Sequence, residues 1–321
     1  MKIKRNIQIG TLILIVGLFC AIFGALNNGV KSIAFIGIKP VVPEKERQLS
    51  NSITNQKFNS IEIDVKRAKV KIAYGKHFKV EYAGRRSNLP AVKIENNHLI
   101  ISQTNNVLTS TENTIHWKEA RRVERDNTVI KITVPENTKL QKIKVFNNYG
   151  NTSILGVNSA MLEITEMEGA VVLKNLSTNA IDLEANAGKD IYLQNVDLED
   201  GQIQNKNTNL NVNGGTIKNI AIDSDHGSVG LENLTLDGGM THTHFGNTTL
   251  SKVELVNGYL IDTKNGNNTV QKTQVENYTL TAKNGNNQAF GKQRKSRFSN
   301  QNAHNINTLS LTVTNGNNVI K

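Results

Sequence analysis

Two aspartates and two histidines are the side chains of this chain whose types and spacing best suit chemistry. Asp223 and Asp225 stand 19 residues before His242 and His244 respectively (242 − 223 = 19 and 244 − 225 = 19). Imidazole nitrogens and carboxylate oxygens are common ligands of metal ions, and paired carboxylates cleave glycosidic bonds. The four residues are therefore candidates for a metal site or for the active site of a polysaccharide-cleaving enzyme. The alternative is a solvated face on which opposite charges attract each other across neighbouring strands.

The 19-residue spacing between these side chains belongs to a repeat that runs through most of the chain. The tetrapeptide Asn-Gly-Asn-Asn begins at Asn265, Asn284 and Asn315, and looser copies precede it. Aligned on this turn, nine copies follow one another at intervals of 19 or 20 residues, with a last interval of 31. The turn residues are Gly150, Gly169, Gly188, Thr208, Gly227, Gly246, Gly266, Gly285 and Gly316. A nearly constant period over nine copies is the signature of a repeat protein.

Apolar and polar residues alternate on both sides of each turn. Five residues before the turn stand, for example, Ile164, Leu183, Ile203 and Ile222, and the residues between apolar positions are mostly polar. Alternation with a period of two predicts strands with one buried face, and glycine adopts a positive φ at the turn without steric cost. Each copy is therefore predicted to be a coil of two or three short strands.

A single coil cannot bury its apolar face, but stacked coils can, because each strand then pairs in parallel with its equivalents at ~4.8 Å. The sequence predicts an all-β protein in which residues 140–321 form a β-solenoid; an antiparallel sandwich of evenly spaced hairpins is the alternative. Stacking places Asp223 beside His242 and Asp225 beside His244 on the outer surface. Uniform coils offer no long loops to wall a catalytic cleft, so we expect no enzyme activity, no cofactor and no metal.

The coils are interrupted once, by an insertion over residues 289–306 that accounts for the long last interval. It carries four cations within six residues, Lys292, Arg294, Lys295 and Arg297. Such a cluster attracts phosphate-bearing polymers, so we expect partners such as teichoic acids, anionic lipid head groups or extracellular DNA. The alternative is a solvated loop in a chain whose net charge is +11. Nothing in the sequence resembles a module that reads specific nucleic-acid sequences.

The N-terminal region has the pattern of a membrane anchor. Three cations lie in a predicted cytoplasmic tail over residues 1–6, and residues 7–26 follow without a charge. About 20 apolar residues cross a bilayer as one helix, and basic residues before it favour a cytoplasmic N-terminus. We expect an uncleaved signal-anchor with the rest of the chain outside the cell; a cleaved signal peptide is the alternative. The single cysteine, Cys20, excludes an intramolecular disulfide and falls within this segment.

Two less regular regions separate the anchor from the coils. Residues 27–57 show no clear periodicity and contain Pro40 and Pro43, which predicts a stalk. Residues 58–139 alternate with a different spacing and are predicted to form a β-rich cap. A cap is needed because a stack of parallel strands would otherwise expose an edge that aggregates.

The strand pattern of the cap resembles that of a known family. The segments Phe58–Val65, Val80–Tyr82 and Ile130–Pro135, the Tyr74-Gly75 turn and the glycine-ended repeats after them resemble the bacterial putative-adhesin family of β-strand-repeat surface domains over residues 58–321. The resemblance implies an extracytoplasmic β-rich domain behind an N-terminal membrane segment, without catalytic residues to transfer. Some members of the family resemble accessory proteins of cell-envelope stress systems.

These observations together predict a single-pass membrane protein with an extracellular C-terminal domain, from a Gram-positive bacterium. We expect a non-enzymatic role in adhesion or in binding envelope polymers. The first alternative is an accessory protein of an envelope-stress system that acts through a membrane protein partner. A more distant alternative is a polysaccharide-active enzyme that uses the face between Asp223 and His244.

Overall fold

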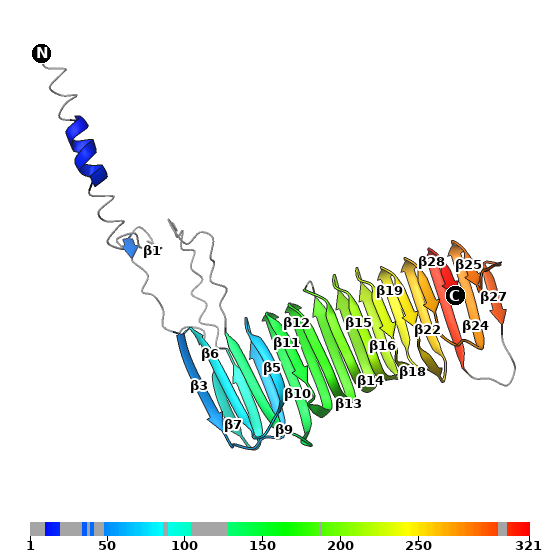
Figure 1. Ribbon diagram of the computed structural model, residues 1–321, viewed down its shortest axis with the longest axis horizontal. Coiled ribbons are helices and arrows are strands. Elements are labelled where there is room, and N and C mark those ends of the chain that lie inside the picture. Colours follow the sequence, from blue (N-terminus) through cyan, green and yellow to red (C-terminus); the bar gives the residue numbers. More distant parts are fainter. Residues whose placement is uncertain are drawn as a thin grey trace, which may run out of the picture. The chain divides into compact units, whose positions relative to one another are not determined.

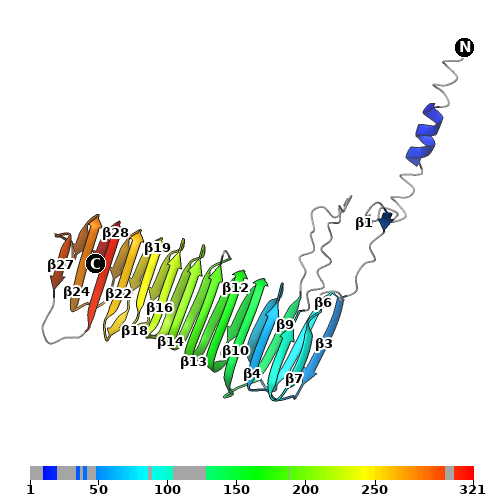
Figure 2. The ribbon, with the colours of Figure 1, turned by 180° about the vertical axis from the view of Figure 1, so that it is seen from behind.

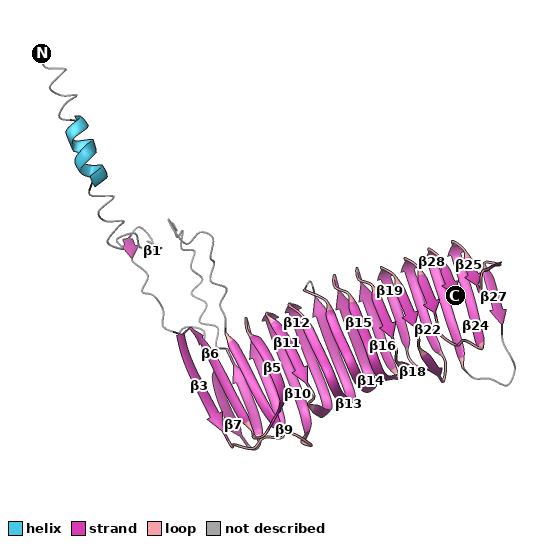
Figure 3. Cartoon of the chain, in the orientation of Figure 1, coloured by secondary structure: helices cyan, strands magenta, loops and turns pink. Residues whose placement is uncertain are grey.

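The computed structural model describes residues 10–19, 34–36, 39–41, 48–85, 89–103, 128–186, 188–300 and 307–321. The chain divides into two compact units, the first made of residues 1–47 and 105–125 and the second of residues 48–104 and 126–321. The described residues of the first unit form a helix over 10–19 and an antiparallel pair of strands, β1 (Ala34–Ile36) and β2 (Lys39–Val41). The second unit is built from strands, as the colours of Figure 3 show.

The N-terminal helix covers only part of the predicted membrane anchor. Within the described part of the chain, no helix is both long enough and apolar enough to cross a membrane. The membrane-spanning helix predicted over residues 7–26 is therefore not found there. The predicted tail over 1–6, and residues 7–9 and 20–26 of the predicted anchor, lie outside the described residues.

The second unit stacks its strands in two long parallel rows (Figure 1). The first row, in spatial order, contains β10 (Lys139–Tyr149), β12 (Asn158–Glu168), the second half of β13 (Val171–Asn186), the second half of β14 (Ile191–Lys206), β16 (Ile220–Asp225), β19 (Met240–Phe245) and β22 (Tyr259–Asn265). The second row contains β11 (Asn151–Leu155), the first halves of β13 and β14, β15 (Leu210–Lys218), β17 (Val229–Glu232), β20 (Thr248–Ser251) and β23 (Asn268–Gln271). A short third row continues from β15 through β18 (Thr235–Asp237) to β21 (Glu254–Val256).

The register of these rows follows the sequence period. Leu183 pairs with Ile203 and Ile203 pairs with Ile222, offsets of 20 and 19 residues. The pairing is parallel throughout this part of the unit, which confirms the predicted solenoid and excludes the antiparallel sandwich.

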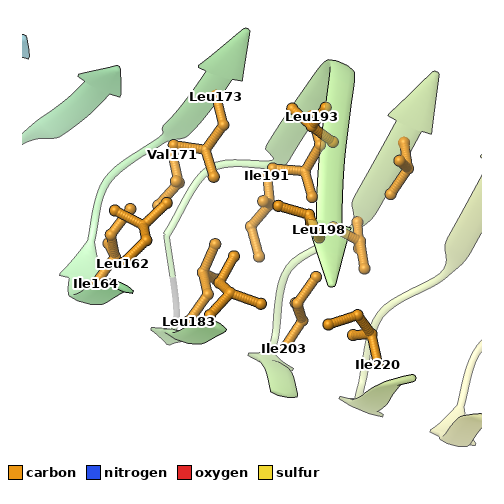
Figure 4. Packing of buried hydrophobic residues seen from close by; sticks show 14 of the residues in the cluster. Leu162, Ile164, Val171, Leu173, Leu183, Ile191, Leu193, Leu198, Ile203 and Ile220 are labelled. Atoms are coloured by element: carbon orange, nitrogen blue, oxygen red, sulfur yellow. The ribbon is translucent and has the colours of Figure 1, made fainter. Parts of the chain in front are cut away.

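The core is a narrow column of aliphatic side chains between the rows. Ile203, Ile222, Thr241 and Ile261 occupy equivalent places in four successive coils, and all four are fully buried. Figure 4 shows how residues such as Leu173 and Leu193 from one row face Leu183 and Ile203 from the other. Burial of apolar surface at ~25 cal/mol per Å² stabilises each coil only when neighbouring coils cover it.

Close stacking at the turns explains one of the repeated glycines directly. A Cβ atom built on Gly169 would lie 1.4 Å from the carbonyl oxygen of Gly150 in the preceding coil. No side chain fits such a gap, so this turn position requires glycine.

The N-terminal end of the unit combines parallel and antiparallel strands. β4 (Ser60–Val65) and β5 (Lys69–Gly75) extend the two rows beyond β10 and β11, and β8 (His98–Ser102) and β9 (Val129–Pro135) form the next parallel layer. β7 (Ala91–Glu95) then covers β8, β6 (Lys79–Arg85) covers β9, and β3 (Gln48–Thr54) covers β6, all antiparallel. The region predicted as a cap therefore contains regular solenoid layers as well as the closing strands.

Candidate functional site

The last coil of the chain lies between the two coils that precede it in sequence. β28 (Thr308–Asn315) pairs in parallel with β22 on one side and with β24 (Asn277–Asn284) on the other. β29 (Asn318–Ile320) likewise lies between β23 and β25 (Asn287–Ala289). Figures 1 and 2 show β28 in this place from opposite sides. The coil made of β24 and β25 is thereby displaced to the end of the stack.

The basic segment predicted as an insertion over residues 289–306 contains two strands that close this end of the stack. β26 (Lys292–Arg294) pairs antiparallel with β25, and β27 (Arg297–Asn300) pairs antiparallel with β24. Residues 301–306 of the predicted insertion lie outside the described residues. The four cations therefore lie on the terminal strands β26 and β27 and on the turn between them.

Three of the four predicted polyanion-binding residues are exposed, and one is engaged in packing. Lys292, Lys295 and Arg297 are exposed. The guanidinium of Arg294 lies 4.5 Å from the ring centroid of Phe298, and its Nε is buried without a hydrogen-bond partner among the described residues. This cation–π contact holds Arg294 against the sheet and leaves the other three available to a ligand.

The C-terminal segment of the chain carries basic residues but no acidic ones. From Asn277 to Lys321 the sequence contains six lysines and arginines and no aspartate or glutamate. Within the described part of the chain, none of the four cations of β26, β27 and the turn between them forms an ion pair. Positive charge on edge strands also discourages pairing with a foreign sheet, so these residues have a structural use beside any binding role.

The aspartate–histidine face forms two separate contacts instead of one constellation. Nδ1 of His242 lies 3.4 Å from Oδ2 of Asp262. Oδ1 of Asp225 lies 3.4 Å from Nδ1 of His244 and 2.8 Å from Nδ1 of His226. Asp223 is the strand neighbour of His242 but is not in an ion pair with it in the described structure.

Aromatic packing accounts for the position of the second contact. The ring of Phe245 stacks on His226 at 4.6 Å and lies 4.4 Å from His244. His226 adopts a positive φ of 58° directly before the turn glycine, so the sequence period did not mark it as part of this group. Within the described residues no group of three or more such side chains could hold a metal ion.

One buried carboxyl group inside the coils, that of Glu166, was not predicted from the sequence. Glu166 is fully buried, and its Oε2 accepts hydrogen bonds from Thr152 Oγ1 at 2.8 Å and from Asn147 Nδ2 at 3.2 Å. Burial raises the pKa of Glu166 to about 8, against the opposite effect of these hydrogen bonds and one from the backbone of Gly150. Its position, three residues before the turn, usually carries a small side chain such as Ala185 or Ser224, and that contrast was the available signal.

The strand pairing shows that the protein is a β-solenoid of parallel coils, closed at both ends by antiparallel strands. Residues 58–321 match the sequence profile of the Toastrack DUF4097 family, and the chain belongs to this family. The match confirms the resemblance inferred from the strand pattern over the same residues.

Several solved structures resemble this chain over most of its length, at low sequence identity and with TM-scores below 0.5. They include a "putative adhesin" of Bacteroides fragilis NCTC 9343, with 13% identity over 87% of this chain and 99% of that chain and a TM-score of 0.43. A "putative cell adhesion protein" of Clostridium sporogenes ATCC 15579 shows 12% identity over 86% and 99%, with a TM-score of 0.30. A "putative lipid binding protein" of Parabacteroides distasonis ATCC 8503 shows 12% identity over 86% and 98%, with a TM-score of 0.38. No curated protein matches this chain in sequence.

Proposed function

We propose that this protein is a non-enzymatic cell-surface protein that binds anionic polymers of the cell envelope through the C-terminal end of its solenoid. The observation that carries the proposal is the acid-free stretch from Asn277 to Lys321, which presents Lys292, Lys295 and Arg297 on or beside the closing strands. A polyanion meets no local negative charge on this stretch.

The physical basis is a cluster of exposed cations, which attracts a polymer of repeating phosphates. Lys292, Lys295 and Arg297 lie within six consecutive residues on β26, β27 and the turn between them, so one flexible polymer chain can contact several of these charges. Each phosphate contact releases a counterion, which makes such binding strongly dependent on salt. The ligand needs no cavity, only an exposed edge.

The surface location rests on the N-terminal sequence. Residues 7–26 carry no charge, and the helix over 10–19 exposes its apolar side chains, including Leu14 and Phe19. We propose that this segment anchors the protein in the cell membrane and leaves the solenoid outside. The polymers within reach would then be those of the envelope, such as teichoic acid.

The experiment that tests the proposal is a pull-down of the full-length protein in detergent with purified cell wall, with and without its teichoic acid. We expect retention only with the polymer, and weaker retention as salt rises. The triple variant K292Q/K295Q/R297Q should bind less and lower the salt slope by about two to three. The control variant K69Q/K71Q/K131Q removes three exposed cations at the other end of the solenoid and should bind normally.

Two results would overturn this function. Equal losses in both triple variants would show that only net charge matters. Absence of binding to either wall preparation at low salt would favour the alternative, an accessory protein of an envelope-stress system that contacts a membrane protein.

A further inference from the structure

One glycine in the middle of a strand has no structural requirement to be glycine. Gly230 lies in β17, is not among the positive-φ glycines, and would carry a Cβ only 3.5 Å from Asn211 Oδ1 and 4.0 Å from the Leu210 carbonyl oxygen. Those are ordinary contacts, unlike the 1.4 Å approach at Gly169. Glycine weakens a strand interior, and a common reason to keep it is the close approach of a ligand.

The missing side chain opens a groove on the outer face of the second row. Gly230 pairs with Asn211 on one side and with Thr249 on the other, so the hollow lies between these two side chains. The groove has a volume of about 450 Å³, within the ~300–1,000 Å³ of small-molecule sites. Its polar lining consists of Asp190, Asn209, Asn211, Ser228, Asn247 and Thr249.

One wall of the groove is held rigid by hydrogen bonds between coils. Asn209 Nδ2 donates to Asp190 Oδ1 at 3.1 Å, and Asn209 Oδ1 accepts from the Ser228 N–H at 3.0 Å. Ser228 Oγ accepts from the Asn247 N–H at 3.2 Å, which leaves its hydroxyl hydrogen to donate elsewhere. These side chains are therefore fixed before any ligand arrives, and a fixed site loses less entropy on binding.

An aromatic side chain stands beside the groove. Tyr192 is the strand neighbour of Asn211, and 47% of it is exposed. Its hydroxyl donates to Asp190 Oδ2 at 3.1 Å, a bond that raises the pKa of Tyr192 and fixes the tyrosine beside the groove. An exposed ring held in place in this way offers an apolar face next to a set of polar groups.

The lining selects the chemical class of the ligand. It contains amides, hydroxyls and one carboxylate but no lysine or arginine, so it does not attract phosphate or sulfate. Amides and hydroxyls donate and accept hydrogen bonds as sugar hydroxyls do, and the tyrosine ring can cover the C–H face of a pyranose. We propose that the groove around Gly230 binds a neutral saccharide.

This site is independent of the polyanion-binding end, and the two respond differently to salt. Binding of a neutral sugar should hardly change with ionic strength, whereas polyanion binding should fall steeply. Failure of one proposal would leave the other standing.

The test is calorimetric titration of the full-length protein with four neutral oligosaccharides: cellotetraose, maltotetraose, mannotetraose and the tetramer of N-acetylglucosamine. We expect at least one to bind. The variant G230Q should weaken that binding about tenfold or more, equivalent to about 1.4 kcal/mol, because its side chain fills the groove while its Cβ is tolerated. Y192A should weaken it as well, and its exposed position makes misfolding no concern.

The matched control is T269Q, which adds bulk in the same outward row of the sheet, two coils beyond Gly230. It should bind normally. The proposal is wrong if none of the four sugars binds, or if G230Q binds as tightly as the natural protein while its circular dichroism spectrum is unchanged.

Discussion

The side-chain amide of Asn315 donates a 2.7 Å hydrogen bond to Oδ1 of Asn265, a residue 50 positions earlier in the chain. Asn284, which lies between them in sequence, is placed on the far side and donates to Asn315 Oδ1 at 2.8 Å. The three Asn-Gly-Asn-Asn turns therefore stack in the order 265, 315, 284. The final coil acts as an interior layer of the solenoid, although it is the C-terminus of the chain.

The coil made of β28 and β29 should be needed for the stability of the C-terminal end of the solenoid. Leu311 is buried between Ile261 and Leu280, so L311A should lower the free energy of unfolding by about 2–5 kcal/mol. Val319 is half-buried in the same coil, and V319A should cost clearly less. Urea denaturation of both variants would measure the difference, and equal effects would contradict the interior position of β28.

Glu166 should make stability depend on pH. Its pKa is about 8 in the folded protein and about 4.5 when unfolded, so the folded state holds a proton that the unfolded state releases between these values. Stability from this group is complete below pH 4.5 and is lost as pH rises to 8, by about 4–5 kcal/mol at most. Chemical denaturation of E166Q across this range should show a smaller fall than the natural protein.

The two proteins should be equally stable near pH 4, where both side chains are neutral, and E166Q should be the more stable near pH 8. Parallel curves for the two would mean that Glu166 is solvated in the folded state. The comparison between variants removes the contributions of all other titrating groups.

Two glycine-to-alanine variants should show which glycine is required for packing and which is not. In G169A the new Cβ would collide with the Gly150 carbonyl oxygen, and we expect a loss of several kcal/mol or failure to fold. In G230A the new Cβ makes ordinary contacts, and we expect stability within about 1 kcal/mol of the natural protein. Thermal unfolding followed by circular dichroism would distinguish them; a strongly destabilised G230A would show that this position is structural after all.

The buried asparagines should matter more than the exposed ones. Asn318 accepts from Asn268 Nδ2 at 2.8 Å and donates to Asn287 Oδ1 at 2.9 Å, all three being fully buried. N318A leaves both neighbours short of a partner, at about 1–3 kcal/mol each. N284A removes an exposed bond at the same end and should cost less than about 1 kcal/mol. Urea midpoints would compare them, and similar values would contradict a role for burial.

Sequence periodicity was sufficient for the solenoid because its two signals agree. The alternation around residues such as Ile203 sets the buried face, and the turn spacing sets the register, so the parallel pairing of Leu183, Ile203 and Ile222 could be predicted. The order of the last coils could not. Segments 277–289 and 308–320 carry the same apolar pattern and the same tetrapeptide, so either one fits against β22.

The candidate sites were less accessible to sequence reasoning than the fold. The basic residues were visible as a cluster, but the strand pairing that places Arg297 opposite Thr281 depends on the chain reversing direction after β25. Asp225 was matched to His244 by the period, whereas its shorter contact with His226 comes from a left-handed turn residue. Glu166 and Gly230 each differ from the residue type that is usual at their position in the repeat. Whether such a residue is buried or beside a groove can be seen only in the structure.

The interior position of β28 also limits the order in which the last coils can assemble during synthesis. A ribosome makes residues from the N-terminus onward, so β22 and β24 both leave it before the strand that separates them exists. The layers beyond β23 can reach their final order only once residues 308–320 have been made. A chain that stopped before Thr308 would lack the strand that β22 and β24 share, and the backbone groups with which both pair to β28 would have no partner there.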